Sequence, residues 1–232
     1  MMMPESQVDA MGVQSFANMK RQSPIDKNPK DNAYVNCVVR PIVGEVGGRW
    51  EVVVFNDQTP NAFALPGGKI GVHTGIFQVA KDQSQLAAVL GHELAHVLSK
   101  HANERLSQQL AVKEGLNILQ VVGNPSSPLG QLAMGALGIG AQYGILLPYS
   151  RVQESEADLF GLELMAKAGF DPRESIQLWM NMERFGGGQP PEFLSTHPSH
   201  STRIHDLESH MPKAMQLYQA AQATGKNPRC GR

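Results

Sequence analysis

The spacing of apolar and polar residues along the chain changes several times, and each change predicts a different element. The run RWEVVVF at residues 49–55 is rich in β-branched and aromatic residues and ends at a turn signal, which predicts a strand. The segments 61–65 and 69–73 predict two further extended pieces, joined through a Pro-Gly-Gly turn. We therefore expect a small antiparallel β-sheet in this part of the chain.

Helical spacing replaces the strand pattern after Asp82. This residue can cap a helix, and Gln85 completes a capping-box pattern. The predicted helix has a broad apolar face, made by Leu86, Val89, Leu90, Leu94, Val97 and Leu98. A second helix is predicted from about 103 to 122, and a looser apolar period predicts another over residues 4–22.

The last third of the chain also has helical spacing. A helix is predicted from 151 to 168, because Gly169 is a typical left-handed cap, and another begins after Asp171-Pro172. A closing helix should end near His210. These patterns predict a single α+β domain, mostly helical, with the small sheet beside the helix that follows Asp82. Its expected parts are an N-terminal helix and linker (1–30), the sheet (49–75), two helices (82–122), an apolar hairpin (123–149), the later helices (150–210) and a C-terminal tail (211–232).

The segment from Leu129 to Leu147 contains no charged residue, and its length would just allow a membrane span. Five glycines interrupt it between Gly130 and Gly144, and prolines flank it on both sides. These interruptions favour a mobile, Gly-rich hairpin that covers a groove, and they argue against a membrane-spanning helix.

Composition narrows the classes of function. A hydrophobic content of 41% and a charged content of 18% are those of an ordinary globular protein, and a net charge of −1 provides no field that would attract nucleic acid. Cys37 and Cys230 are too far apart for a CxxC motif, and they either form a structural bridge in an oxidising compartment or remain inert thiols. The first residues lack the basic and apolar regions of a secretory signal.

The helix after Asp82 carries the pattern HExxH as His92-Glu93-Leu94-Ala95-His96. Positions i and i+4 lie on one face of a helix, so His92 and His96 can share one metal ion. Glu93 is rotated away from that face by about 100° and is placed to act as general base towards a water activated by zinc. Two surface histidines are the alternative, but the apolar neighbours make this a core helix, where unpartnered imidazoles would be costly.

A catalytic zinc site needs a third protein ligand. In the run ESEAD, Glu154 and Asp158 are i and i+4 on one helix face, so Glu154 could reach the metal while Asp158 accepts a hydrogen bond from a liganding histidine. Glu156 points elsewhere. The alternative is an acidic helix N-terminus that only complements the helix dipole.

HELAH, followed by ESEAD and then by THPSHSTRI, resembles the zinc peptidase family of the HtpX and BepA type, which also contains the CAAX prenyl proteases. The resemblance covers about residues 60–210. It implies one Zn²⁺ per chain, held by His92, His96 and Glu154, with Asp158 supporting the histidines. The absence of several apolar spans places the chain nearer the soluble envelope branch of the family.

The resemblance also implies roles for residues outside the two helices. His197 and Arg203 match a downstream HPxxxxR pattern and are expected to be catalytic; His197 would either stabilise the oxyanion or occupy the fourth zinc position and keep the enzyme latent. Asn61, Ala62, Phe63 and Ala64 would form an edge strand that binds extended substrate, although an ordinary hairpin fits the same composition. His101, His200, His205 and His210 are expected on solvated surfaces.

The function that these patterns favour is a zinc-dependent endopeptidase that acts on unfolded or misassembled envelope proteins. The resemblance implies a periplasmic or outer-membrane location, with membrane association through a removed lipid anchor, and nucleic acid is not an expected partner. The competing interpretation is a latent, zinc-containing, chaperone-like module that binds envelope proteins without cleaving them. Intact Glu93 favours the enzyme.

Overall fold

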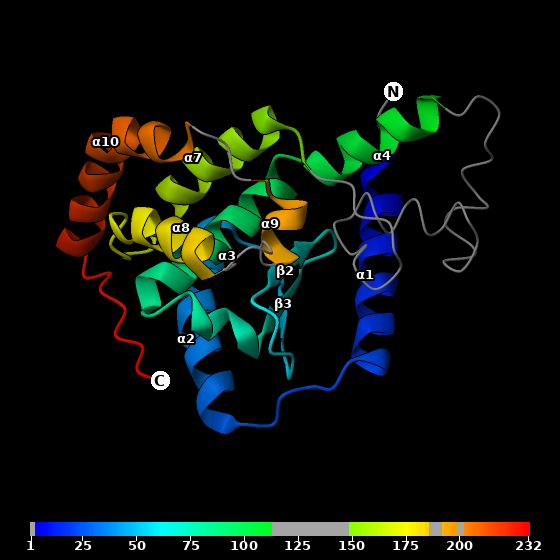
Figure 1. Ribbon diagram of the computed structural model, residues 1–232, viewed down its shortest axis with the longest axis horizontal. Helices are drawn as coiled ribbons and strands as arrows, with labels where there is room; N and C mark the ends of the chain where they lie inside the picture. Colours follow the sequence, from blue (N-terminus) through cyan, green and yellow to red (C-terminus); the bar gives the residue numbers. More distant parts are fainter. Residues whose placement is uncertain (1–2, 113–148, 186–191, 199–201) are drawn as a thin grey trace.

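The structure, a computed structural model, describes residues 3–112, 149–185, 192–198 and 202–232. These residues form an α+β arrangement dominated by helices, which confirms the expected fold class (Figure 1). The first half contains α1 (Glu5–Gln22), α2 (Pro29–Val46), β1 (Glu51–Phe55), β2 (Ala62–Leu65), β3 (Lys69–His73), the 3-10 helix η1 (Thr74–Gln78), α3 (Gln83–Leu98) and α4 (His101–Val112). The second half contains α7 (Arg151–Lys167), α8 (Glu174–Phe185), α9 (Glu192–Thr196) and α10 (Arg203–Ala223).

The sheet is mixed, where the sequence pattern predicted an antiparallel one. Its strand order is β1-β3-β2; β1 pairs with β3 in parallel and β2 pairs with β3 antiparallel. The connection 56–61 crosses the end of β3, where Gly75 N donates to Asp57 O at 2.7 Å, before β2 begins. Strand β3 therefore inserts between β1 and β2, an order that the alternation of side chains within each strand does not specify.

Helices cover both faces of this sheet, with α1 on one side and α2 and α3 on the other (Figure 1). Along β2, Ala62 and Ala64 pack into the large core with α3, while Phe63 and Leu65 pack into a smaller core with Phe16 of α1. The period of two of a strand separates these side chains onto opposite faces. Both faces of β2 are therefore buried.

Helix α2 had no counterpart in the sequence interpretation. It begins where the Asn28 side chain accepts a hydrogen bond from Lys30 N at 3.0 Å, with Pro29 in the first turn. Its buried residues include Tyr34, Val38 and Ile42, at helical spacing. The periodicity was therefore present, but Pro41 inside the helix obscured it.

The closing helix also runs further than predicted, to Ala223 and not to about His210. Pro212 lies inside α10. A proline removes one helical hydrogen bond without preventing the turns on either side, so the breaker signal ended the predicted helix too early.

The C-terminal tail after α10 is fastened to α2 and to the start of α3. Cys230 forms a disulfide with Cys37, so the bridge interpretation of the two cysteines is correct. Gln83 holds the same segment, because its amide donates to Pro228 O at 2.9 Å and its carbonyl accepts from Cys230 N at 2.7 Å. Arg232 donates to Asp31 at 2.8 Å.

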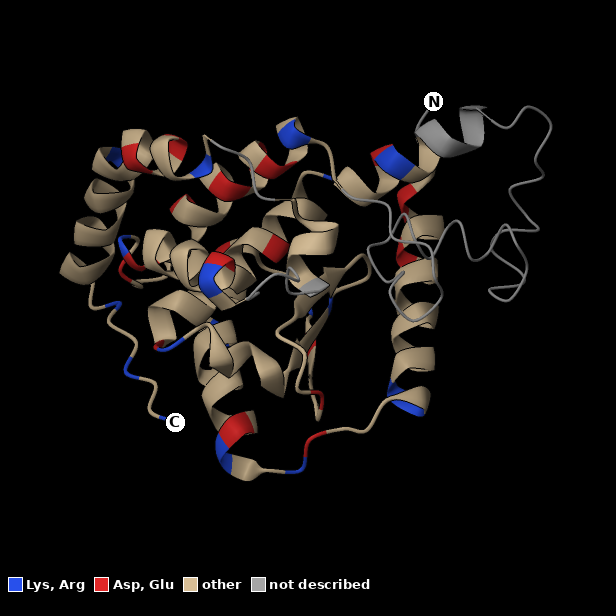
Figure 2. Ribbon diagram, in the orientation of Figure 1, with Lys and Arg blue, Asp and Glu red and all other residues tan. Residues whose placement is uncertain are grey.

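Acidic and basic residues are interspersed along the helices (Figure 2). No helix within the described ranges is long and apolar enough to cross a membrane. The predicted hairpin 123–149 lies outside the described residues except for Tyr149, and so does the part of the predicted helix 103–122 that follows Val112.

Candidate metal centre and active site

Helix α3 brings the HExxH residues into the centre of the molecule. Its N-cap is Asp82, as predicted, and the side chain accepts hydrogen bonds from Ser84 N and Gln85 N at 2.8 and 2.9 Å. His92, Glu93 and His96 are each no more than 4% exposed. The alternative of two surface histidines is therefore excluded.

Helix α7 crosses α3 closely enough to deliver its carboxylates to these histidines. At the crossing, a Cβ atom added to Gly161 would lie 2.7 Å from His92 N, and one added to Gly91 would lie 2.8 Å from Gly161 O. Both positions therefore require glycine for steric reasons. Helix α7 begins with a capping box between Ser150 and Gln153, which places Glu154 in its first turn.

Four side chains converge on one point: His92, His96, Glu154 and His197. The two Nε2 atoms of His92 and His96 are 3.1 Å apart, and His96 Nε2 is 3.3 Å from Glu154 Oε1. His197 Nδ1 is 3.1 Å from His92 Nε2 and 3.0 Å from Glu154 Oε1. One ligand atom from each of the four lies within 4.8 Å of the others.

This group fits a zinc ion in donor type and number. Zinc takes imidazole nitrogen and carboxylate oxygen, usually four ligands, and binds the neutral form of histidine. Burial lowers the pKa of His96 well below its ordinary value, which keeps this imidazole neutral. Burial alone would raise the pKa of Glu154, but the charge of His197 and hydrogen bonds from His197 and His96 hold it far below the usual range.

Asp158 and Arg203 contact two of the four donor residues. Asp158 Oδ1 lies 3.0 Å from His92 Nδ1, the outer nitrogen of this histidine, which is the placement that the sequence predicted. Arg203 is 2% exposed and donates from Nε to Asp158 at 2.7 Å and from its terminal nitrogen to Glu154 at 2.6 Å. Its guanidinium also lies 3.9 Å from the Trp179 ring centre.

These contacts change the interpretation of Arg203. The sequence comparison implied a catalytic role, whereas the guanidinium is engaged with two carboxylates and stacks on Trp179. Arg203 therefore positions Glu154 and Asp158 and balances their charge. Its sequence position could not reveal this, because α10 and α7 meet only in the folded chain.

Glu93 lies beside the donor group without belonging to it. Its Oε1 is 3.3 Å from His197 Nε2, and its carboxylate accepts a backbone hydrogen bond from Ala64 of β2. Burial raises the pKa of Glu93 above its ordinary value. A carboxylate whose pKa moves towards neutrality is a better proton acceptor at physiological pH.

The expected substrate strand lies directly next to Glu93. Ala62, Phe63 and Ala64 belong to β2, the outer strand of the described sheet, and Asn61 precedes it with its carbonyl accepting from His73 N at 3.0 Å. The ring of Phe63 packs against Phe16 and Phe55 in the smaller core. The side chain of Phe63 is therefore engaged in the core and does not face the donor group.

His101 was expected on a solvated face, and this prediction was wrong. The side chain is 2% exposed, with Nδ1 2.9 Å from His96 Nδ1 and Nε2 3.3 Å from Glu156 Oε2. Glu156, which was expected to point elsewhere, also accepts a hydrogen bond from Ser99 Oγ at 2.9 Å. His205 and His210 are exposed on α10 as predicted, and His200 lies outside the described residues.

Two further residues that the sequence interpretation missed lie near the donors: Tyr149 packs against two of them, and Arg105 packs against Tyr149. The ring of Tyr149 lies 3.9 Å from that of His96 and 5.1 Å from that of His197, and the guanidinium of Arg105 lies 3.8 Å from the centre of the Tyr149 ring. Tyr149 N donates to Thr196 O at 3.1 Å. This link fastens the start of α7 to the segment that carries His197.

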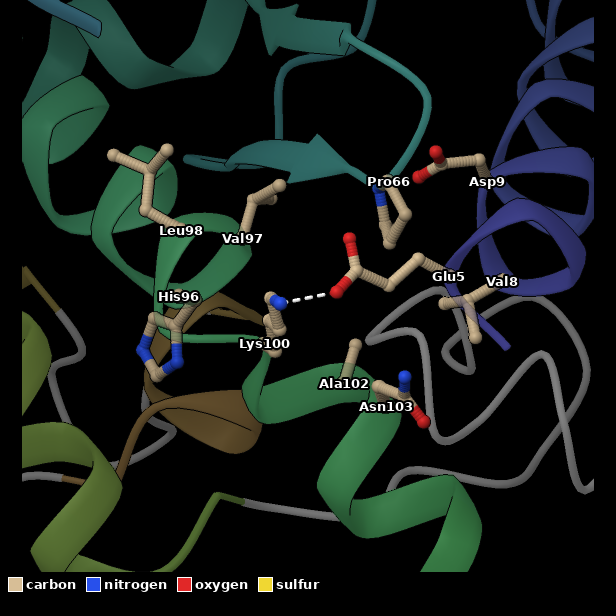
Figure 3. A pocket seen from close by; sticks show the side chains of 10 residues that line it. All are labelled: Glu5, Val8, Asp9, Pro66, His96, Val97, Leu98, Lys100, Ala102 and Asn103. Atoms are coloured by element: carbon tan, nitrogen blue, oxygen red, sulfur yellow. Dashed lines mark hydrogen bonds and ion pairs between the residues drawn. The ribbon is translucent and has the colours of Figure 1, made fainter. Parts of the chain in front are cut away.

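A cavity of about 230 Å³ lies beside the donor group, between α1, the turn after β2 and the end of α3 (Figure 3). Val8, Pro66 and Val97 provide apolar walls, and His96 also lines the cavity. Glu5 and Lys100 form an ion pair across it (Figure 3).

Comparison with known proteins gives a consistent result. The model of "Peptidase family M48" matches residues 29–211. The mitochondrial metalloendopeptidase OMA1 of Schizosaccharomyces pombe is 40% identical over 186 residues, which cover 78% of this chain and 53% of that protein. The human mitochondrial metalloendopeptidase OMA1 is 38% identical over 72% of this chain and 33% of its own length. The putative beta-barrel assembly-enhancing protease of Vibrio cholerae is 31% identical over 81% of this chain and 40% of its own length. The chain thus spans about half, or less, of the length of the relatives that it matches.

Proposed function

Because the chain belongs to peptidase family M48, we propose that it is a zinc-dependent endopeptidase in which Glu93 is the general base. The observation that carries the proposal is the convergence of His92, His96 and Glu154, from two distant segments, on one buried point next to Glu93. Asp158 and Arg203 hold two of these ligands in place.

The three ligands and the base divide the chemistry between them. Zinc bound by His92, His96 and Glu154 supplies Lewis acidity to the peptide carbonyl and to water. Glu93 accepts a proton from the attacking water as the new C–O bond forms, and then returns it to the amine as the C–N bond breaks. The raised pKa of Glu93 and its hydrogen bond from Ala64 N suit both steps.

Substrate binds as an additional strand along the edge of β2. This arrangement uses main-chain hydrogen bonds and accepts many sequences, as an enzyme for unfolded chains requires. The burial of both faces of β2 supports it, because only the edge is left for recognition. The hydrogen bond from Ala64 to Glu93 then sets the distance between the bound peptide and the base.

In this proposal His197 would be a fourth zinc ligand in a latent state of the enzyme. Its Nδ1 is as close to Glu154 and His92 as the ligand atoms of the HExxH helix are to each other. A catalytic zinc site keeps one position open for water or substrate. Substrate hydrolysis would therefore require that His197 withdraws from this position. The competing role of His197 is to stabilise the oxyanion.

The proposed substrates are unfolded or misassembled envelope proteins, and nucleic acid is not a partner. The relative named for β-barrel assembly supports this class of substrate. The disulfide between Cys37 and Cys230 supports an oxidising compartment such as the periplasm. The proposed membrane attachment is a lipid anchor. The relatives with mitochondrial names indicate the competing location.

The experiment measures zinc content and cleavage of casein by the purified protein, with and without a chelator. Glu93→Gln should keep one zinc per chain and lose about 10²- to 10⁴-fold in cleavage, since it removes only the base. Glu208→Gln, an exposed change on α10, is the matched control and should cleave like the unaltered protein. Unchanged cleavage by Glu93→Gln would refute the mechanism.

The alternative, a latent chaperone-like module, is favoured by the four donors, which would satisfy a closed zinc site. The same experiment separates the two functions. Stoichiometric zinc, suppression of client aggregation and no cleavage in any condition, including after replacement of His197, would support the module and not the enzyme.

A further inference from the structure

We infer that His101 is a positioning residue for the zinc ligand His96, and that Glu156 determines the direction of the hydrogen bond between the two imidazoles. This inference rests on the proposed role of His96 as a zinc ligand. It concerns three side chains in series: His96 and His101 are joined through their Nδ1 atoms at 2.9 Å, and His101 Nε2 lies 3.3 Å from Glu156.

The two zinc-binding histidines of α3 have different partners on their outer nitrogens. His92 Nδ1 faces the carboxylate of Asp158 at 3.0 Å, an acceptor that can only receive a hydrogen bond. His96 Nδ1 faces the imidazole nitrogen of His101, which can either donate or accept. The contact between His96 and His101 therefore does not by itself specify which of the two Nδ1 atoms carries the proton.

Glu156 resolves this ambiguity. An ionised carboxylate only accepts, so it favours the tautomer of His101 that carries its proton on Nε2. His101 Nδ1 is then an acceptor, and His96 must carry its own proton on Nδ1. The Nε2 atom of His96, which points at the donor group, is left with the free electron pair that zinc requires.

The opposite direction of the hydrogen bond is unfavourable at Glu156 and incompatible with zinc binding at His96. If His101 donated from Nδ1, its unprotonated Nε2 would face the carboxylate of Glu156, and His96 would carry its proton on Nε2, directed at the metal position and at Glu154 Oε1, 3.3 Å away. A neutral imidazole carries one ring proton, so His101 cannot donate from both nitrogens.

The backbone between the two histidines is shaped for this contact. Helix α3 ends at Leu98, and Lys100 adopts a left-handed conformation with φ of 59° before α4 begins at His101. In an uninterrupted helix, residues five apart would be separated by about 140° around the axis and could not meet. The strained turn at Lys100 therefore places His101 against His96.

Glu156 reaches the same turn from α7. Its other oxygen accepts a hydrogen bond from Ser99 Oγ at 2.9 Å. This exposed carboxylate therefore contacts the residues on either side of Lys100, Ser99 and His101. Helix α7 thus contributes to both zinc-binding histidines, through Asp158 at His92 and through Glu156 at His96.

The test compares replacements at position 101 by two measurements. Zinc affinity is measured by competition with a chelator of known affinity, and the tautomer of His101 is read from imidazole ¹⁵N chemical shifts in the zinc-loaded protein. His101→Phe removes the acceptor and should weaken zinc binding about 10- to 100-fold, the usual effect of losing an outer hydrogen-bond partner. His101→Asn retains an acceptor near the position of Nδ1 and should restore most of the affinity.

Glu156→Gln keeps an acceptor for His101 and should have a small effect on zinc affinity, while Glu156→Ala should lower it. The exposed change His205→Phe is the control for a histidine that contacts no ligand. Circular dichroism verifies that each variant folds. If His101→Phe does not fold, the Glu156 variants still test the inference.

The outcomes separate this inference from the proposed function. Unchanged zinc affinity in His101→Phe, or a His101 proton on Nδ1 in the zinc-loaded protein, would overturn the role of His101 while leaving the peptidase intact. Failure of the unaltered protein to bind zinc would instead refute the proposed function.

Discussion

Gly91 and Gly161 face each other where α3 and α7 cross, and neither position has room for a methyl group. Gly91 directly precedes the first zinc-binding histidine, and Gly161 lies on the same face of α7 as Glu154 and Asp158, about two turns after Glu154 and one turn after Asp158. This contact sets how closely the carboxylates of α7 approach the imidazoles of α3. The glycines therefore determine the size of the metal site without contacting the metal.

Gly161→Ala should weaken both the fold and the zinc site. The added Cβ would lie 2.7 Å from His92 N and 2.8 Å from Gly91 C, so α7 must move away from α3. We expect a loss of about 1–3 kcal/mol in the free energy of unfolding, the usual cost of overpacking. Urea unfolding of the metal-free protein and zinc competition measure the two effects.

The matched control is Gly44→Ala in α2, where an added Cβ meets nothing within 4 Å. Alanine is favoured over glycine inside a helix, so this change should leave zinc binding intact and stabilise the protein by about 0.5–1 kcal/mol. Equal behaviour of the two variants would show that the crossing does not control the site.

Arg203→Met should destabilise the metal-free protein by about 3–5 kcal/mol, because it leaves Glu154 and Asp158 as buried charges without their cation. Zinc should restore part of this loss, since the ion replaces the missing positive charge. Thermal unfolding with and without zinc measures both quantities. Arg184→Met, at the exposed end of α8, is the control, and a similar loss in both variants would argue against the positioning role.

His197→Ala should lower zinc affinity while raising casein cleavage. The change removes one of four donors and opens the position that water and substrate need. Chelator competition and initial cleavage rates provide the two measurements, with His205→Ala as the control. A fall in cleavage without a change in zinc affinity would instead assign His197 to the oxyanion and exclude its role as a ligand.

Removal of the disulfide should loosen the C-terminal tail and destabilise the protein by about 2–5 kcal/mol. The double variant Cys37→Ala/Cys230→Ala is compared with the unaltered protein by denaturant unfolding, each with and without reductant. Reductant should lower the stability of the unaltered protein to that of the variant and should leave the variant unchanged. A variant as stable as the oxidised protein would show that Gln83 and Arg232 hold the tail without the covalent bond.

Much of the catalytic helix was predictable because its signals are local. The cap at Asp82, the apolar period and the HExxH spacing all lie within five turns of one helix, where the backbone geometry relates the residues directly. Glu154 and Asp158 were predictable in the same way as a pair on one face. The order of the strands was not, because three short extended segments are compatible with several sheets.

The contacts of His101 and Arg203 could not be predicted from the sequence. The contact of His101 with His96 depends on a left-handed turn at a lysine, a conformation for which the residue type provides no signal. The contact of Arg203 with Glu154 and Asp158 depends on the packing of α10 against α7. In both cases a polar residue was buried by a partner that lies elsewhere in the fold.

The amino-acid sequence alone determined the metal chemistry, since the residue types and their helical spacing specify two imidazoles, a base and a candidate third ligand. Only the tertiary structure decided which groups contact them and how the sheet is ordered. The physical reason is that helical spacing depends on a few neighbouring residues, whereas the close approach of α3 and α7 depends on side chains that meet only after the chain has folded.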